Sequence, residues 1–283
     1  MRTVYLNGEF MPETEARIPV LDRGFIFGDG VYEVIPVYGG KLFRFAEHLQ
    51  RLQNSLDALK IKNPLAIEAW EQTLTELIKR NAGGDLSLYL QVTRGSAERD
   101  HAIPDNPVPT VFAMCNPLKP LPSETVDNGV AAITLDDIRW LRCHIKAISL
   151  LPNVLLRQEA LDQGAAEAIL IRDGQATEGA ASNLFAVIDG VITTPPKSPM
   201  LLPGITRDLV LELAEKNSLP CQEKDISLEE LQKADEIWLT SSTKEILSVT
   251  ELNGQPVANG KPGPLYQKTL ALYQAYKQAL RQN

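Results

Sequence analysis

Alternating hydrophobic and polar residues at the start of the chain predict paired β-strands. Residues 3–10 alternate around Asn7-Gly8, a pair that favours the left-handed backbone of a tight hairpin turn. A second predicted hairpin joins residues 30–38 to residues 41–45 through Gly39-Gly40. Two further strands are expected, at residues 86–93 and 110–115.

The stretch between the two hairpins, LDRGFIFGDGVYE, is rich in glycine and aromatic residues. It lacks the G-x-G-x-x-G spacing of a dinucleotide-binding loop, and it leads into a strand rather than a helix. We expect a tight loop here. Tyr32 enters the strand directly after it, so its hydroxyl could point into a cleft.

A helical period replaces the alternation after the second hairpin and predicts helices at residues 46–60 and 67–81. Arg51 lies at the border of the apolar face of the first helix. It is either a solvated arginine or a fork that binds phosphate. The apolar face itself is marked by leucines at helical spacing: Leu49, Leu52, Leu56 and Leu59.

A charged loop, TRGSAERDHAIP, follows the strand at residues 86–93. Within it, Arg99 and His101 are spaced so that both can aim hydrogen-bond donors at one carboxylate. Read alone, the same pattern is also typical of a solvated loop.

A proline-rich stretch without periodicity, NPLKPLPSE, predicts a boundary between two domains. We expect an N-terminal α/β domain at residues 1–118, a linker at 119–124, and a larger C-terminal domain at 125–283. The second domain combines strands, tight turns and helices, which predicts a compact β structure with helices packed on it. Its expected elements are strands at 129–135, 167–171, 175–188 (with a turn after it) and 236–239, and helices at 153–163, 204–217, 227–230 and from 264 onward.

Lys146 lies in a strand-like segment whose apolar residues predict burial. A buried ammonium is unfavourable unless its charge is paired or lost, so the neutral amine needed for Schiff-base chemistry becomes accessible. The alternative is a lysine whose head reaches water. The apolar residues that predict burial are Ile138, Trp140, Ile145, Ile148, Leu150 and Leu151.

Composition narrows the class of protein. The 283 residues are 44% hydrophobic and 23% charged, as in ordinary globular proteins, and the net charge of -8 argues against nucleic acid or an anionic membrane as partner. Three cysteines and three histidines lack metal-ligand spacing, so no metal is expected. No apolar signal core or membrane span is evident, which indicates a cytoplasmic protein.

Several of these features together match one cofactor. They are the lysine Lys146, an acid in a buried-looking strand (Glu178), and two candidate anion sites, at the helix start 204–206 and in the hydroxyl-rich loop 240–243. Pyridoxal 5′-phosphate needs an amine for its aldehyde, a carboxylate for its pyridine nitrogen and a cradle for its phosphate. A Ser/His/Asp triad is not supported, because G-x-S-x-G is absent.

The chain resembles the fold-type IV pyridoxal-phosphate enzymes, and most closely the D-amino acid (D-alanine) aminotransferases. The resemblance covers nearly the whole length. It is carried, in order, by DRGFIFGDGVYEVIPVY, EHLQRL, QVTRGSAERDHAIP, DIRWLRCHIKAISLL, ATEGAASNLF, LLPGITRD and LTSSTKEI. It implies a two-domain α/β (α+β) fold with a small N-terminal domain and a larger, β-barrel-like C-terminal domain.

The resemblance also implies roles for individual residues. Lys146 is similar to the lysine that binds the cofactor covalently and moves the substrate proton, and Glu178 to the acid paired with the pyridine nitrogen. Tyr32, Arg99 and His101 are similar to the trap for the substrate carboxylate, with the last two supplied by the partner subunit of a homodimer. The remaining cofactor-binding positions are Arg51, Leu202, Ile205, Thr206, Ser241 and Ser242.

The implied reaction is transamination between a D-amino acid and 2-oxoglutarate, giving a 2-oxo acid and D-glutamate. One departure is Ala180-Ala181, where this subgroup commonly has serines; it bears on substrate range. Two alternatives share the fold: aminodeoxychorismate lyase and branched-chain L-amino acid aminotransferase. A third is a dimeric protein that binds the cofactor without catalysis.

Overall fold

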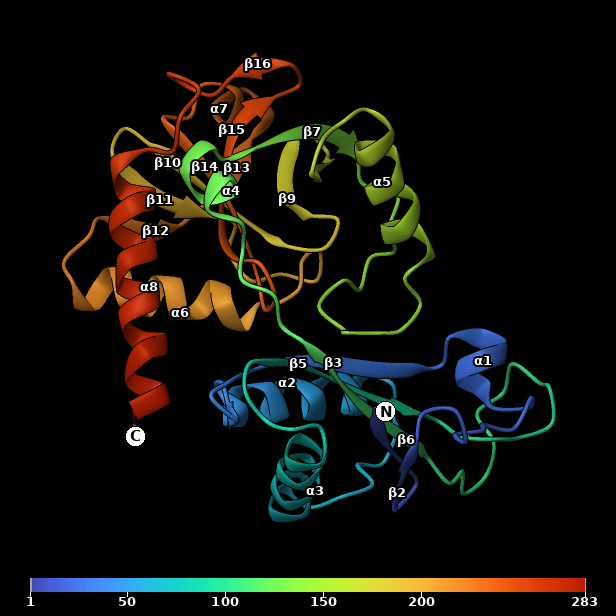
Figure 1. Cartoon of the computed structure of the whole chain (residues 1–283). Helices are drawn as coiled ribbons and strands as arrows, with labels where there is room; N and C mark the ends of the chain where they lie inside the picture. Colours follow the sequence, from blue (N-terminus) through green and yellow to red (C-terminus); the bar gives the residue numbers. More distant parts are fainter. Residues whose placement is uncertain (1, 283) are drawn as a thin grey trace. The chain divides into compact units, whose positions relative to one another are not determined.

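The computed structural model describes residues 2–282 (Figure 1). Their contacts divide the chain into two compact units: residues 1–119, 145–150 and 280–283 in the first, and residues 120–144 and 151–279 in the second. The helices are α1 (Arg23–Phe27), α2 (Phe45–Ala58), α3 (Ile67–Arg80), α4 (Ser123–Asn128), α5 (Leu151–Asp162), α6 (Ile205–Lys216), α7 (Leu228–Gln232) and α8 (Pro264–Gln282).

Strands alternate with these helices along the chain. They are β1 (Thr3–Leu6), β2 (Glu9–Pro12), β3 (Gly30–Tyr38), β4 (Lys41–Leu42), β5 (Leu86–Thr93), β6 (Thr110–Pro117), β7 (Val130–Asp136), β8 (Glu167–Arg172), β9 (Gln175–Gly179), β10 (Asn183–Ile188), β11 (Val191–Thr194), β12 (Cys221–Glu223), β13 (Ile226–Ser227), β14 (Glu236–Ser241), β15 (Glu245–Leu252) and β16 (Gln255–Pro256). The mixed α/β fold class is confirmed.

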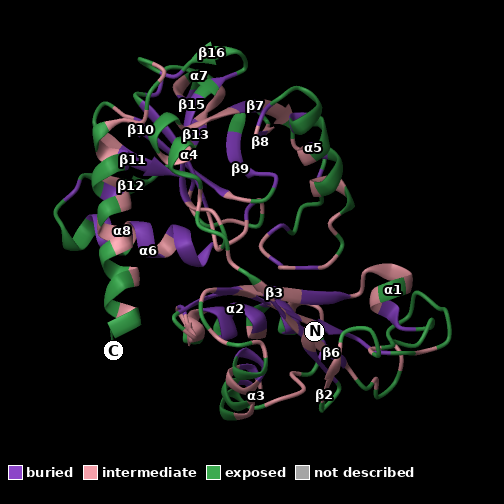
Figure 2. Cartoon of the chain, in the orientation of Figure 1, coloured by how far each residue is buried: buried purple, intermediate pink, exposed green. Residues whose placement is uncertain are grey.

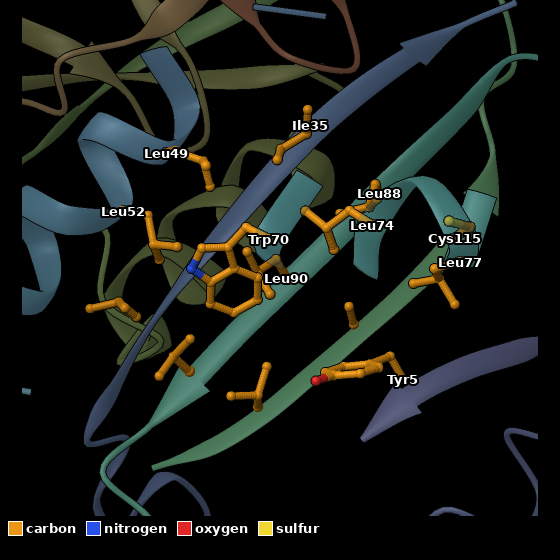
Figure 3. Close-up of a cluster of buried hydrophobic side chains, with 14 of the residues drawn as sticks. Tyr5, Ile35, Leu49, Leu52, Trp70, Leu74, Leu77, Leu88, Leu90 and Cys115 are labelled. Carbon is orange, nitrogen blue, oxygen red and sulfur yellow. The ribbon is translucent and has the colours of Figure 1, made fainter. Parts of the chain in front are cut away.

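The first unit is an antiparallel sheet in the order β2-β1-β6-β5-β3-β4, with α2 and α3 on one face. Both predicted hairpins are confirmed, and Asn7, Gly39 and Gly40 have the positive φ that their turns require. Both helices were also predicted correctly. Their apolar faces bury Leu52 and Trp70 against the sheet, as Figure 3 shows.

The loop expected before β3 contains a short helix instead. Asp22 caps α1 by accepting a hydrogen bond from the Gly24 backbone N–H at 2.8 Å, and Gly28 ends it with φ 67°. An N-cap aspartate and a glycine at the C-terminus are standard helix signals, but five residues are too few to show a helical period.

The second unit is built on a mixed ten-stranded sheet. The path runs β12-β11-β10-β14-β15-β7-β8-β9-β13, with β16 paired to β15. Here α5 packs on β7 and β8, and the capping box predicted at Ser227 and Glu230 starts α7. The predicted compact β structure with packed helices is confirmed. Two elements were not expected: α4 in the proline-rich stretch and the short strand β12.

The segment around Lys146 is not a strand, and its predicted burial is only partly right. Residues 141–150 are irregular, with a single β-bridge between Ala147 and Val31. Ile145 is buried, whereas Ile138, Trp140 and Leu151 are 59%, 47% and 68% exposed. Apolar residues in an irregular segment carry no period, so the sequence could not tell which of them point inward.

The expected domain limits of 1–118, 119–124 and 125–283 remain a prediction. The first compact unit reaches Lys119, beside the expected linker, but it also takes in residues 145–150 from the far side of that linker. Between residues 2 and 282, no helix is long and apolar enough to cross a membrane.

Candidate active site

Glu178 lies near the end of β9, a strand that is buried along most of its length (Figure 2). Its side chain is 5% exposed. One carboxylate oxygen, Oε1, accepts a hydrogen bond from Arg139 Nη1. The other, Oε2, accepts from Asn183 Nδ2 at 3.0 Å and from the Leu202 backbone N–H at 3.1 Å. A buried carboxylate bonded in this way stays ionised and keeps one orientation.

Arg139 is itself held by a second carboxylate. Its Nε and Nη2 donate to the two oxygens of Asp137, each at 2.9 Å, and Arg172 Nη2 lies 3.0 Å from Asp137 Oδ2. Burial alone would raise the pKa of Asp137, but hydrogen bonds and charge from Arg139 outweigh it and lower that pKa. Acids and guanidinium groups therefore alternate from Arg172 to Glu178.

The N-terminus of α6 offers a place for an anion. Gly204 is its N-cap and provides no side-chain hydrogen bond to the first turn, where Ile205 and Thr206 are buried. The exposed N–H groups and dipole of a twelve-residue helix favour a negatively charged group. The helix predicted from residue 204 is thus confirmed, and the anion at its start stays a prediction.

The loop after β14 supplies hydroxyl groups in the same unit. Ser241 Oγ accepts a hydrogen bond from the Lys244 backbone N–H at 3.2 Å, and Ser242 follows it, half-buried. Thr240 Oγ1 is buried without a hydrogen-bond partner in the described part of the chain. An orphaned buried hydroxyl is costly unless a ligand satisfies it. Together with the bare N-terminus of α6 and the buried acid Glu178, it fits pyridoxal phosphate.

Lys146 belongs to the first unit, where its backbone is held on both sides. Its N–H donates to Ser55 Oγ at 3.2 Å, and its carbonyl accepts from the Tyr32 N–H at 3.0 Å. The side chain is half-buried, and Nζ lies 4.2 Å from the centre of the Tyr32 ring. The structure therefore brings two predicted site residues, Lys146 and Tyr32, together. An amine over an aromatic face is partly desolvated, as covalent lysine chemistry requires.

Arg51 is buried rather than solvated. Its Nε and Nη2 donate to the two oxygens of Glu33 at 2.8 and 2.7 Å, and His48 Nδ1 lies 2.8 Å from Glu33 Oε2. Burial would raise the pKa of Glu33, but Arg51 and His48 lower it to about 2, while burial lowers the pKa of His48. Glu33 thus fixes the orientation of Arg51. Whether Arg51 binds phosphate stays a prediction.

Arg99 and His101 meet at one aromatic ring. The His101 ring centre is 5.5 Å from that of Phe27, and the Arg99 guanidinium carbon is 5.4 Å from it. Both residues are exposed. The predicted pair is thus brought together at the protein surface, where its donors can bind an anion.

The predicted site residues fall into two groups by unit. Glu178, Leu202 and the residues of the two anion sites lie in the second unit, and Lys146, Tyr32, Arg51, Arg99 and His101 lie in the first. Among the described residues no group of acids, histidines or cysteines could hold a metal ion.

Sequence reasoning missed four residues of these networks. Glu33 had a signal: in β3 it shares the inward face with Val31 and Ile35, where a charge is exceptional. His48 falls on the apolar face of α2, one position before Leu49. Arg139 and Asn183 had no such signal, because 39 residues separate Arg139 from Glu178.

A cavity of about 470 Å³ lies elsewhere in the first unit, on the sheet face opposite to α2 and α3. None of the predicted site residues lines it. Its walls are mostly apolar, with Asp22 satisfied by Thr93 and Thr110, so it lacks the donors and amine that the candidate chemistry needs.

Comparison with known proteins agrees with the family resemblance. The amino-transferase class IV family matches residues 30–252. A D-alanine aminotransferase of Bacillus licheniformis is 45% identical over 262 residues, covering 93% of this chain and 92% of that protein. One from Staphylococcus epidermidis is 39% identical over 279 residues, 99% of each chain.

Solved structures point to a different member of the same fold. The crystal structure of the branched-chain amino acid aminotransferase of Escherichia coli matches with a TM-score of 0.90 at 27% identity, covering 96% of this chain and 93% of that chain. Sequence similarity is thus higher to the D-specific enzymes, while the backbone is shared with the branched-chain enzymes.

Proposed function

The chain belongs to the class IV aminotransferases, and we propose that it transfers an amino group from a D-amino acid such as D-alanine to 2-oxoglutarate, giving a 2-oxo acid and D-glutamate. The observation that carries the proposal is the near full-length similarity to D-alanine aminotransferases. The exposed Arg99 and His101 around Phe27 are consistent with it, because such a pair suits a carboxylate.

Pyridoxal 5′-phosphate is the proposed cofactor, which supplies an electron sink that stabilises negative charge on the substrate Cα. Lys146 would hold it covalently, Glu178 would pair with its ring nitrogen, and Leu202 would lie against the ring. Its phosphate would be bound by the remaining residues of the proposed set: Arg51, Ile205, Thr206, Ser241 and Ser242.

Glu178 has a defined task in this proposal. A carboxylate that is buried, ionised and fixed by three donors holds a proton on the ring nitrogen more firmly than one exposed to water. Lys146 Nζ has the other: as a neutral amine it takes the proton from the substrate Cα and returns it at C4′ of the cofactor. The hydrogen bonds to its backbone from Tyr32 and toward Ser55 limit where that amine can reach.

Substrate selection is assigned to the exposed pair. Arg99 and His101, from the partner subunit of a homodimer, would bind the substrate carboxylate together with Tyr32. Fixing the carboxylate decides which way the Cα–H points, so the side from which Lys146 approaches selects the D-enantiomer. Amino acids and 2-oxo acids are the proposed small-molecule partners.

One spectroscopic experiment tests the function. The purified protein with bound cofactor is mixed separately with D-alanine and L-leucine, and loss of its visible absorption band is followed. Conversion by D-alanine alone is expected. Conversion by L-leucine alone would assign the chain to the branched-chain activity that its structural similarity suggests.

The same experiment addresses the remaining alternatives. A band that neither amino acid changes, in a protein that releases pyruvate from aminodeoxychorismate, would identify the lyase. A band that no substrate changes would identify a protein that binds the cofactor without catalysis.

A further inference from the structure

Asn183 makes two hydrogen bonds with one amide group. Its Nδ2 donates to Glu178 Oε2 at 3.0 Å and to the Leu202 carbonyl at 2.8 Å. The Leu202 N–H donates to the same Glu178 oxygen. Asn183 is 6% exposed, so neither bond is exchanged easily for water. Glu178, Asn183 and the Leu202 backbone therefore form a closed ring of hydrogen bonds.

This ring is fastened to the start of α6. A Cβ on Gly204, the N-cap of α6, would lie 1.8 Å from Asn183 Oδ1, so the backbone approaches the amide more closely than any side chain would allow. Only two residues separate Leu202 from Ile205, where α6 begins. The position of the helix N-terminus is thus tied to the Glu178 carboxylate through Asn183.

Arg139 reinforces the same connection from the other oxygen. Its Nη1 donates to Glu178 Oε1, and its Nη2 donates to the Met200 carbonyl at 3.2 Å. Asp137 binds Nε and Nη2 of the same guanidinium, so most of the arginine's charge is balanced there. Glu178 consequently gains a donor without losing its own negative charge to Arg139 alone.

We propose that Asn183 and Arg139 are positioning residues that hold the Glu178 carboxylate at a set distance from the N-terminus of α6. The proposal rests on the proposed function, in which Glu178 meets the ring nitrogen of pyridoxal phosphate and α6 meets its phosphate. A cofactor of fixed length binds best when its two anchors are already spaced to match, because no free energy is then lost in moving them.

The test uses the apoenzyme and two probes. Asn183→Asp keeps the shape that contacts Gly204, removes both donors and places a second negative charge beside Glu178. Its dissociation constant for pyridoxal 5′-phosphate, measured by quenching of tryptophan fluorescence, is expected to rise about tenfold or more. Its dissociation constant for inorganic phosphate, which contacts only the phosphate end, is expected to stay within about twofold.

Three further variants separate positioning from folding. Asn183→Ala removes the donors without adding charge and should also weaken cofactor binding selectively. Asn217→Asp is the matched control, because Asn217 bonds Leu213 at the other end of α6 and should leave both constants unchanged. Asp137→Asn should lower kcat about tenfold with KM nearly unchanged, since Arg139 then draws more of the Glu178 charge.

Each outcome has a defined meaning. Unchanged cofactor binding in both Asn183 variants would overturn the proposal. Equal weakening of phosphate and cofactor binding would also overturn it, because it would mean that α6 itself had been damaged. If the unaltered protein binds pyridoxal phosphate but catalyses no transamination, the proposed function fails while the positioning roles still stand on the binding data.

Discussion

The Glu178 cluster and the Arg99–His101 loop contrast in how their charges are held. Glu178 is buried and accepts hydrogen bonds from Arg139, Asn183 and Leu202, all within one unit. Arg99 and His101 are exposed and meet at Phe27 through ring contacts. The first arrangement suits chemistry that needs one fixed geometry. The second suits recognition of a ligand that arrives from solution.

Lys146 lies between these extremes, half-buried with a fixed backbone, and its replacement is expected to have the largest effect. In Lys146→Ala, kcat should fall by about 10⁴-fold, because the base that moves the substrate proton is gone. Turnover of D-alanine with 2-oxoglutarate measures it. Lys62→Ala, at an exposed position, serves as control. Rates near those of the unaltered protein would remove Lys146 from catalysis.

Glu178→Gln should have the next largest effect and tests the buried side of the comparison. The amide keeps the size of the side chain but loses the charge that holds a proton on the ring nitrogen. We expect kcat to fall about 10²- to 10³-fold with a small change in KM. Steady-state kinetics against Glu229→Gln, an exposed ion-pair partner, would reveal it. A loss confined to KM would contradict the assignment.

Glu33 asks whether burial and an arginine partner are enough to make an acid catalytic. Glu33→Gln leaves Arg51 and His48 without their carboxylate, so we expect about 3–5 kcal/mol lower stability in urea unfolding at pH 7. The effect on kcat should be smaller than that of Glu178→Gln. The reverse order of the two effects on kcat would blur the distinction between the clusters.

The pH dependence of stability follows from the same triad. Because the pKa of Glu33 is depressed from 4.5 to about 2, its contribution is complete above pH 4.5 and is lost as the pH falls toward 2. His48, with its pKa lowered from 6.5, contributes fully above pH 6.5 and progressively less below it. The stability difference between the unaltered protein and Glu33→Gln should therefore shrink at acid pH. A constant difference from pH 7 to pH 3 would argue against the depressed pKa.

Arg99→Met tests the exposed side of the comparison. Loss of a charged donor to the substrate carboxylate should raise KM for D-alanine about 10- to 100-fold. Because the residue is exposed, thermal stability should stay the same. The Arg2→Met variant, at a half-exposed position outside the proposed site, is a control. An unchanged KM would exclude Arg99 from the carboxylate trap.

Phe27→Leu should have the smallest effect. Removing the ring takes away the surface that orients Arg99 and His101, and a cation–π contact contributes about 0.5–1 kcal/mol, so KM should rise about two- to fivefold. Phe25→Leu is a matched control, since Phe25 is 71% exposed on the same helix. Equal effects of both variants would mean that the Phe27 ring has no special role in placing the pair.

Local patterns were sufficient wherever an element has its own period or turn. The hairpin at Asn7-Gly8, strand β5, the two helices of the first unit and the capping box of α7 follow from neighbouring residues, because backbone preference and side-chain periodicity act over a few positions. Ordered motifs along the chain likewise indicated the family, and the family comparison confirmed it.

Contacts between distant residues were decided only by the tertiary structure. Lys146 lies in an irregular segment positioned by Tyr32, and Glu178 is held by Arg139 and Asn183 across separate elements. Such contacts depend on where whole strands and helices pack, and no local period encodes them. The sequence by itself therefore determined the elements and the kind of chemistry, while packing decided which charges are buried, which are exposed and what holds each in place.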